Sequence, residues 1–231
     1  MTSRMAVFAS GNGTDLQAIL DYHTTRGKSR AGDVVLVASD RAGAGALERA
    51  RKAGIETAVL RSKSNSGGDE PLQLLQQHRV DFLALAGYLK QVPSCVLVEL
   101  PGRVVNVHPA LLPAFGGPGM YGERVHRAVL ASGARVSGAT VHYVEGEYDS
   151  GATLAQWPVP VLADDSPASL AARVLKVEHV LYPRVIDAVA SGQWRFDARP
   201  RPVPEAAFRS LMNWDERQLV REIDEAFGFK T

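Results

Sequence analysis

Asn106 and His108 are the residues whose types and spacing most directly suggest chemistry in this chain. They end the stretch "VVNVH", and Pro109 follows them. Strand side chains alternate between two faces, so residues two apart point to the same side. An amide N–H and an imidazole that titrates near neutral pH can stabilise and protonate an oxygen that becomes negative during acyl transfer. A structural histidine beside an asparagine that caps a turn fits the same pattern.

A second candidate is the glycine turn in "ASGNGTDLQAI" (residues 9–19), where an apolar segment leads into a helix pattern. Backbone amides at a helix start point outward and carry partial positive charge, which suits a phosphate group. Glycine lets a ligand approach the backbone closely. The turn is neither a P-loop nor a complete dinucleotide fingerprint, because no Gly-Lys-Ser/Thr follows. A tight turn without a ligand remains an equal alternative.

A third candidate is Asp149, in a glycine-containing loop between two apolar segments at 139–144 and 152–161. A carboxylate at this point would orient His108 and raise the pKa of its ring, or hold a water molecule that relays protons. The alternative is an ordinary aspartate of a turn.

Three further polar residues lie in apolar surroundings. His142 belongs to an alternating strand pattern, and we expect it to be packed or exposed at an edge rather than catalytic. Glu178 and His179 interrupt an otherwise apolar helix pattern. A charged side chain on such a face needs a partner or a ligand, unless it lies on the solvent side.

The elements that must position these residues follow an alternating order in the first half of the chain. Apolar strands with helices between them indicate a parallel sheet that is covered on both faces, and therefore a doubly wound α/β fold. Such folds bind ligands at the carboxyl ends of their strands, where Asn106 and His108 lie. The expected strands are 4–10, 33–39, 55–61, 81–87 and 104–108, and the expected helices are 14–25, 44–54 and 71–78.

The alternation changes after residue 120. A helix is expected over 121–133, and the segments 139–144 and 152–161 read as strands without a long helix between them, which suits an antiparallel pair. A long helix is expected over 166–192, begun by a capping serine and kinked or interrupted at Pro183. A proline-rich link and a polar helix follow.

Composition narrows the class of protein. The chain has 231 residues, with 45% hydrophobic and 22% charged residues, which fits one globular domain or one domain with an extension. The formal net charge of +1 gives no broad basic face for nucleic acid. A single cysteine, Cys95, excludes a disulfide framework and a thiolate zinc site. We see neither a signal peptide nor a run of ~18 apolar residues, so we expect a cytoplasmic protein without membrane contact.

Five motifs, taken together and in order, carry a family resemblance. They are "SGNGTDLQAIL", "LALAGYLK", "VVNVHPALLPAFGG", "HYVEGEYDSGATLAQWPVPV" and "RVLKVEHVLYP". The chain resembles the folate-dependent phosphoribosylglycinamide formyltransferase family of purine biosynthesis from about residue 4 to residue 195. The block from Asn106 to Pro113 and the Asp149 loop are similar to those of formyltetrahydrofolate-dependent enzymes in general. The short glycine loop and the Glu-His-x-Leu-Tyr-Pro helix narrow the resemblance to the glycinamide ribonucleotide branch.

The resemblance implies a Rossmann-like formyltransferase fold and a direct formyl transfer. The amine of 5-phosphoribosylglycinamide (GAR) attacks the formyl carbon of 10-formyltetrahydrofolate, the co-substrate, and a tetrahedral intermediate forms. Asn106 and His108 stabilise its oxyanion, and Asp149 pairs with His108 and helps proton transfer through water. No metal and no covalent enzyme intermediate are implied. The resemblance also implies a cis bond between Leu112 and Pro113.

The resemblance extends to binding residues in both substrate sites. It implies that Gly13, Thr14 and Asp15 bind the phosphate of GAR and that Pro109 and Glu178 lie near its glycinamide portion. The residues implied to bind folate are Leu89, Lys90, Gln91, Val92, Asn106, Glu145, Gly146, Glu147, Tyr148 and Asp149.

The chain departs from the family pattern at three positions. Many relatives have Ser-Asn after the second glycine, where this chain has Thr14 and Asp15. A carboxylate there repels a phosphate unless it points away from it or caps the helix. A folate-contacting arginine of relatives has no clear equivalent, and Arg61 or Lys63 is the candidate replacement. Leu175 stands where some relatives have a glutamine.

The expected organisation is a formyltransferase domain over 1–195, with a nucleotide-binding half (1–100) and a folate and catalytic half (101–195), followed by an extension over 196–231 with a helix. Monomer and homodimer both fit. The rival functions are formyltetrahydrofolate hydrolase, tRNA formyltransferase and a non-catalytic nucleotide-binding module. We expect the first two to carry a further domain, before the first strand or after residue 195, and the module has no need for Asn106, His108 and Asp149 together.

Overall fold

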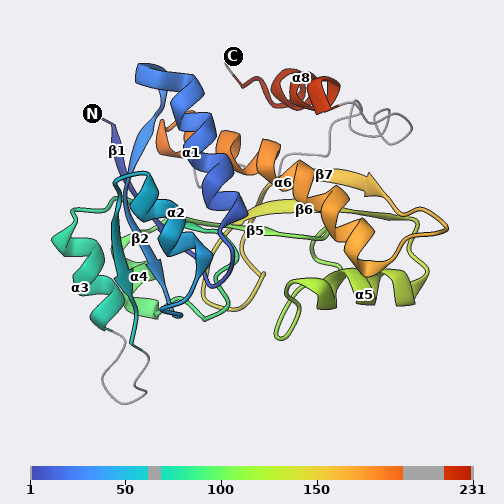
Figure 1. The fold of residues 1–231 in the computed structure, drawn as a ribbon, viewed down its shortest axis with the longest axis horizontal. Helices are drawn as coiled ribbons and strands as arrows, with labels where there is room; N and C mark the ends of the chain where they lie inside the picture. The colour runs from blue at the N-terminus through green and yellow to red at the C-terminus, as the bar shows by residue number, and fades with distance from the viewer. Residues whose placement is uncertain (1, 62–68, 195–215, 230–231) are drawn as a thin grey trace.

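Seven strands form one sheet in the order β3-β2-β1-β4-β5-β6-β7 (Figure 1). The computed structural model describes residues 2–61, 69–194 and 216–229. The strands are β1 (Ser3–Phe8), β2 (Gly32–Ser39), β3 (Glu56–Val59), β4 (Phe82–Leu85), β5 (Val104–His108), β6 (Val136–Tyr143) and β7 (Thr153–Pro160).

The sheet is parallel at one end and antiparallel at the other. β1 pairs in parallel with β2 and β4, β2 with β3, and β4 with β5. β6 pairs antiparallel with both β5 and β7. The expected doubly wound, mostly parallel sheet with an antiparallel pair in the second half is therefore confirmed. The β5–β6 pairing adds an antiparallel contact at the strand that carries Asn106 and His108.

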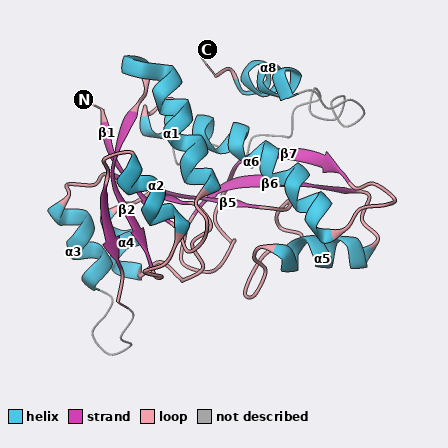
Figure 2. Cartoon of the chain, viewed as in Figure 1, coloured by secondary structure: helices cyan, strands magenta, loops and turns pink. Residues whose placement is uncertain are grey.

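Helices cover both faces of the sheet (Figure 2). One apolar core joins the sheet to α1, α2, α5, α6 and α8, and a second joins its other face to α3 and α4. The bounds are α1 (Thr14–Arg26), the 3₁₀ turn η1 (Gly27–Ser29), α2 (Gly45–Lys52), α3 (Asp69–Gln77), α4 (Ser94–Glu99), α5 (Glu123–Ser132), α6 (Pro167–Ala190) and α8 (Glu216–Phe227).

The long helix α6 differs from expectation at Pro183, where it continues without interruption. A proline inside a helix removes one backbone hydrogen bond. The neighbouring Val180, Leu181, Tyr182 and Val185 are all buried, so packing against the sheet holds the helix together. Ser166 caps the start of α6 through a reciprocal pair of bonds with Ser169, as the sequence predicts. The short helix α4 was not expected. Residues 62–68, and residues 195–215 with the expected proline-rich link, lie outside the described residues.

Thr140 of β6 fixes the chain segment that leaves β5 after His108. Its buried hydroxyl donates to the carbonyl of Ala110 at 2.6 Å and accepts from the amide of Leu112 at 3.0 Å. The side chain of Gln156 donates to the same hydroxyl at 3.0 Å and to the carbonyl of Leu112 at 2.7 Å. The Leu112–Pro113 bond is cis, as the family resemblance implies.

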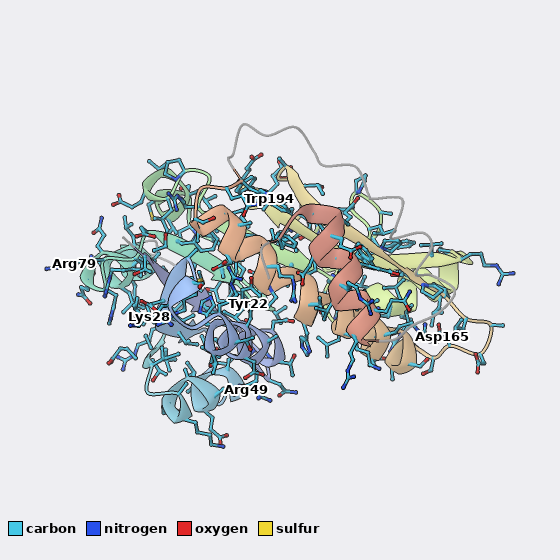
Figure 3. All side chains as sticks on the ribbon, turned by 90° about the horizontal axis from the view of Figure 1, so that it is seen from above. Tyr22, Lys28, Arg49, Arg79, Asp165 and Trp194 are labelled. Atoms are coloured by element: carbon cyan, nitrogen blue, oxygen red, sulfur yellow. The ribbon has the colours of Figure 1, made fainter. Side chains whose placement is uncertain are left out.

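Helix α8 packs on α6, and Figure 3 shows it lying over that helix. Arg184 of α6 pairs with Asp224 of α8 and lies over the ring of Tyr22 of α1 at 5.2 Å. The rings of Trp194 and Phe227 meet edge to face at 5.9 Å. The extension therefore joins the main core. No helix in residues 2–61, 69–194 and 216–229 has the length and apolar character needed to cross a membrane.

Replacing Thr140 by valine tests the role of its hydroxyl. The change leaves the buried amide of Leu112 without its acceptor, so we expect a loss of about 1–3 kcal/mol in the free energy of unfolding. Denaturant unfolding measures it. The matched control is Thr24→Val, because the exposed hydroxyl of Thr24 donates only to a carbonyl of its own helix. Equal losses in the two variants contradict the assignment.

Candidate active site

A cavity of about 740 Å³ opens where β4 and β5 end. It therefore lies at the carboxyl edge of the parallel strands, as expected for this class of fold. Most of the residues singled out from the sequence line it: Asp15, Leu89, Lys90, Gln91, Val92, Asn106, His108, Pro109, Gly146, Glu147, Tyr148, Asp149 and Glu178. Gly13, Thr14 and Glu145 are not among its lining residues.

The ring of His108 lies between two oxygen atoms. Its Nε2 is 2.9 Å from the carbonyl oxygen of Phe115, and its Nδ1 is 3.5 Å from Oδ2 of Asp149. A neutral imidazole donates at only one nitrogen, so these two acceptors are both satisfied only by the protonated ring. The geometry therefore suits a histidine that carries a second proton during the reaction.

Burial of His108 disfavours the protonated, charged form of its ring. It lowers the pKa of His108, while Asp149 and the carbonyl of Phe115 raise it, and the pKa of the ring remains below its ordinary value. His108 is therefore mainly neutral near pH 7, while Asp149 and the carbonyl of Phe115 favour the form of the ring that carries a second proton.

Asp149 connects two histidines. Its Oδ1 is 3.6 Å from Nε2 of His142, and its Oδ2 accepts from the amide of Gly117 at 2.9 Å. Burial raises the pKa of Asp149, but the contacts with His142, His108 and Gly117 outweigh burial and leave the pKa below its ordinary value. The carboxylate is therefore ionised beside His108. Asp149 has a left-handed backbone conformation, with φ of 56°, within the β6–β7 loop.

His142 is buried, as expected, but it also belongs to the polar cluster, which the sequence did not predict. Its Nδ1 is 2.8 Å from the carbonyl oxygen of Tyr143, and its Nε2 is 3.1 Å from Nδ2 of Asn106. A carbonyl only accepts, so Nδ1 carries a proton, and an Nε2 without a proton accepts from the amide of Asn106. This bond fixes the orientation of the Asn106 amide and leaves its second N–H for a ligand. The β5–β6 register, which sets Asn106 opposite His142, brings the two together.

Asp15 turns toward α6 and lines the cavity with Glu178. One carboxylate oxygen of Asp15 is 3.7 Å from Nε2 of His179. Glu178 is only 6% exposed. Burial raises the pKa of Asp15 to about 6, and burial together with Asp15 raises the pKa of Glu178 well above its ordinary value. The carboxyl of Asp15 therefore points into the cavity wall beside His179 and Glu178.

Gly13 ends the glycine turn directly before α1. Its φ is 73°, and a β-carbon there would lie 2.6 Å from the Cα of Ala46. A side chain at this position is therefore excluded twice, by the backbone conformation and by the start of α2. Thr14 begins α1 without a side-chain cap, and it lines a separate hollow of about 590 Å³ between α1 and α2.

A hydrogen bond joins the two segments that are expected to bind folate, 89–92 and 145–149. The side chain of Gln91 donates to the carbonyl of Gly146 at 2.7 Å. The amide of Leu89 donates to the hydroxyl of Ser10, which ties the first segment to the end of β1. Arg61 is not among the cavity's lining residues, and its amide donates to Glu70. Lys63 lies outside the described residues.

Some lining residues gave no usable signal in the sequence. His126 of α5 is 4% exposed, lines the cavity and has a buried Nδ1 without a hydrogen-bond partner. Tyr88 and the glycine-rich segment 117–122 also line it. Their positions in the cavity depend on the paths of the loops that follow β4 and β5. Residue spacing in the sequence does not predict these paths. In the described ranges 2–61, 69–194 and 216–229, no three His, Cys, Asp or Glu side chains gather as candidate metal ligands.

Comparison with known proteins agrees with the fold and the cavity. A family model described as "Formyl transferase" matches residues 3–186. The chloroplastic phosphoribosylglycinamide formyltransferase of Arabidopsis thaliana is 44% identical over 204 residues, which cover 85% of this chain and 69% of the relative. The crystal structure of glycinamide ribonucleotide transformylase 1 from Symbiobacterium toebii matches with a TM-score of 0.78 and 38% identity, over 87% of this chain and 94% of that one.

A formyltetrahydrofolate deformylase from Pseudomonas syringae pv. tomato matches with a TM-score of 0.73, over 83% of this chain and 62% of that one. At 23% identity this likeness shows the fold alone. The fold and the family match together define the class, and the chain is a formyltransferase. Within that class it belongs to the phosphoribosylglycinamide formyltransferase family.

The dependence of His108 on Asp149 is testable in the free protein. We expect Asp149→Asn to lower the pKa of His108 further, because the carboxylate that favours the charged ring is lost. NMR titration of the His108 ring protons measures this shift. Asp164→Asn removes an exposed carboxylate and is the control. An unchanged or raised pKa in Asp149→Asn contradicts the electrostatic coupling.

Proposed function

We propose that this chain transfers the formyl group of 10-formyltetrahydrofolate to the amine of GAR, giving formyl-GAR and tetrahydrofolate, in purine biosynthesis. The amine nitrogen forms a bond to the formyl carbon, and the carbonyl oxygen takes the electron pair. The intermediate then collapses, the bond between the carbon and N10 breaks, and N10 gains the proton that the amine loses. The proposal rests chiefly on one observation, the meeting of Asn106, His108 and Asp149 in one cavity.

Asn106 and His108 are the proposed oxyanion-stabilising residues. The bond to His142 holds the Asn106 amide in place, so that its free N–H is oriented before the substrate arrives. His108 supplies a proton or a hydrogen bond to the same oxygen. Both side chains come from one rigid strand, which limits the reorganisation that the transition state requires.

Asp149 is the proposed partner of His108 in proton transfer. Its carboxylate stabilises the protonated ring and can hold a water molecule between the amine and N10. The amide of Gly117 holds its Oδ2, and this oxygen faces His108. The carboxylate therefore serves as an orienting group and a local charge, with water as the carrier of the proton.

The two substrates are proposed to occupy opposite parts of the cavity. GAR lies over Gly13, Thr14, Asp15, Pro109 and Glu178, with its phosphate at the amides that begin α1. The folate lies between segments 89–92 and 145–149. Both proposed halves of the domain contribute to each substrate site. The nucleotide-binding half, residues 1–100, supplies the start of α1 and segment 89–92, and the folate and catalytic half, residues 101–195, supplies Pro109, Glu178 and segment 145–149.

A hydrolase that releases formate from the same donor is the second candidate, since the deformylase shares the fold. An assay of the purified protein with 10-formyltetrahydrofolate, with and without GAR, separates the two. We expect donor consumption only when GAR is present. Consumption at the same rate without GAR supports the hydrolase, and no consumption or folate binding supports a non-catalytic module.

The roles of His108 and Asp149 predict a loss of turnover. We expect His108→Ala and Asp149→Asn to lower kcat by about 10²–10⁴-fold, while binding of both substrates largely persists, since both residues act mainly on the transition state. Steady-state kinetics and calorimetric binding measure the two effects. The control is His78→Ala, because His78 lies beyond the end of α3 and outside the cavity lining. Unchanged turnover in both site variants refutes the assignment.

Residence in the cytoplasm and the choice between monomer and homodimer also belong to the proposal. Small-molecule substrates are the expected partners. Cell fractionation and sedimentation of the purified protein test these two expectations.

A further inference from the structure

Three ionisable side chains meet at the wall of the cavity where α1 lies against α6. Asp15 comes from the first turn of α1, and Glu178 and His179 are adjacent on α6. Asp15 and Glu178 both line the cavity, and His179 is 3.7 Å from Asp15. We call these three residues the acidic wall. Neither His108 nor Asp149 belongs to it, so its protonation is separate from that of the catalytic cluster.

The carboxyl groups of the acidic wall are poorly satisfied. Oδ1 of Asp15 is buried and makes no hydrogen bond. Glu178 is 94% buried at the cavity wall, and burial together with the neighbouring Asp15 raises its pKa. A buried carboxylate without donors is unstable as an ion, and it either takes a proton or binds a ligand that supplies donors.

The polar groups next to the acidic wall do not neutralise both of its carboxyl groups. Tyr182, one turn after Glu178, is buried, but its hydroxyl bonds to the carbonyl oxygens of Leu85 and Val105 at 2.9 and 3.0 Å. The ring of His179 faces Asp15, with Nε2 at 3.7 Å from Oδ1 of the carboxyl group. The partly exposed histidine therefore contacts one of the two carboxyl groups, that of Asp15. Two neighbouring buried carboxyl groups do not both ionise readily, so one of them keeps a proton near neutral pH.

We propose, building on the function proposed above, that Asp15 and His179 form a positioning pair that keeps a proton on Glu178. Asp15 is the ionised member, next to His179 and at the positive end of α1. Glu178 then meets the nucleotide as a neutral carboxyl group, which donates one hydrogen bond and accepts others. A wall with one ionised carboxylate, next to His179, repels a substrate that carries a phosphate dianion less than a wall with two ionised carboxylates does. Asp15 is thus a specificity-determining residue that acts through Glu178.

Asparagine is the informative substitution at position 15, because it keeps the shape of the side chain and removes its charge. Without the negative neighbour, Glu178 ionises more easily, so its pKa falls. Burial remains and keeps part of the upward shift. The direction is therefore fixed: in Asp15→Asn, Glu178 loses its proton at a lower pH than in the parent protein. The control is Asp21→Asn, on the same helix but outside the cavity lining.

The first test needs no substrate. Carboxyl resonances of isotope-labelled glutamate are followed by NMR in the unliganded full chain, and Glu178→Gln identifies the signal of Glu178. We expect Glu178 to be protonated at neutral pH, and Asp15→Asn to lower its midpoint by about one pH unit or more, a tenfold change in proton affinity. Asp21→Asn leaves the midpoint unchanged. A Glu178 that is ionised at neutral pH, or whose midpoint is the same in Asp15→Asn, overturns the proposal.

The second test detects the titration of Glu178 through the pH dependence of the KM for GAR. As pH rises through the pKa of Glu178, the wall gains negative charge, so the KM for GAR rises while the KM for 10-formyltetrahydrofolate stays constant. Asp15→Asn moves this rise to lower pH by the amount seen in the titration. A rise at the same pH in both proteins rejects the inference. If no formyl transfer to GAR occurs at any pH, the proposed function fails, and the NMR titration still decides the state of Glu178.

Discussion

The antiparallel pairing of β5 with β6 is the constraint on which the rest of the site depends. Parallel strands alone would bring Asn106 and His108 to the edge of the sheet without partners. The register of β6 sets His142 opposite Asn106 and Thr140 opposite His108. One partner orients the catalytic amide, and the other anchors the chain as it leaves the strand. The departure from a parallel sheet therefore occurs where the chemistry needs support.

The same pairing explains how a carboxylate reaches two histidines. β6 and β7 are antiparallel neighbours, so their connecting loop returns over the end of β5. Asp149 lies in that loop and contacts His108 on β5 and His142 on β6. Burial and charge then act in opposite directions on the pKa of His108, and burial prevails, so this pKa lies below its ordinary value. The catalytic cluster and the acidic wall are thus two separate sets of titrating groups in one cavity.

The sequence by itself determined the fold class and pointed to the proposed catalytic residues. Apolar strands with helices between them predict a doubly wound sheet, because both faces of such a sheet are buried. Strand alternation put Asn106 and His108 on one side, since that property is local. The functional meaning of the pair and the choice of Asp149 came from the ordered motifs of the family resemblance, because a single Asn-x-His pattern fits a structural role equally well.

Only the tertiary structure decided the contacts between distant segments. His142 joined the cluster because of strand register, and Asp15 met Glu178 and His179 because α1 packs against α6. The continuity of α6 through Pro183 likewise depends on burial against the sheet. In each case the contacts that stabilise the arrangement come from residues far away in the sequence. A local sequence pattern predicts which face of a strand or helix a side chain occupies. The burial of that side chain and the charges around it depend on which distant segments pack against that face.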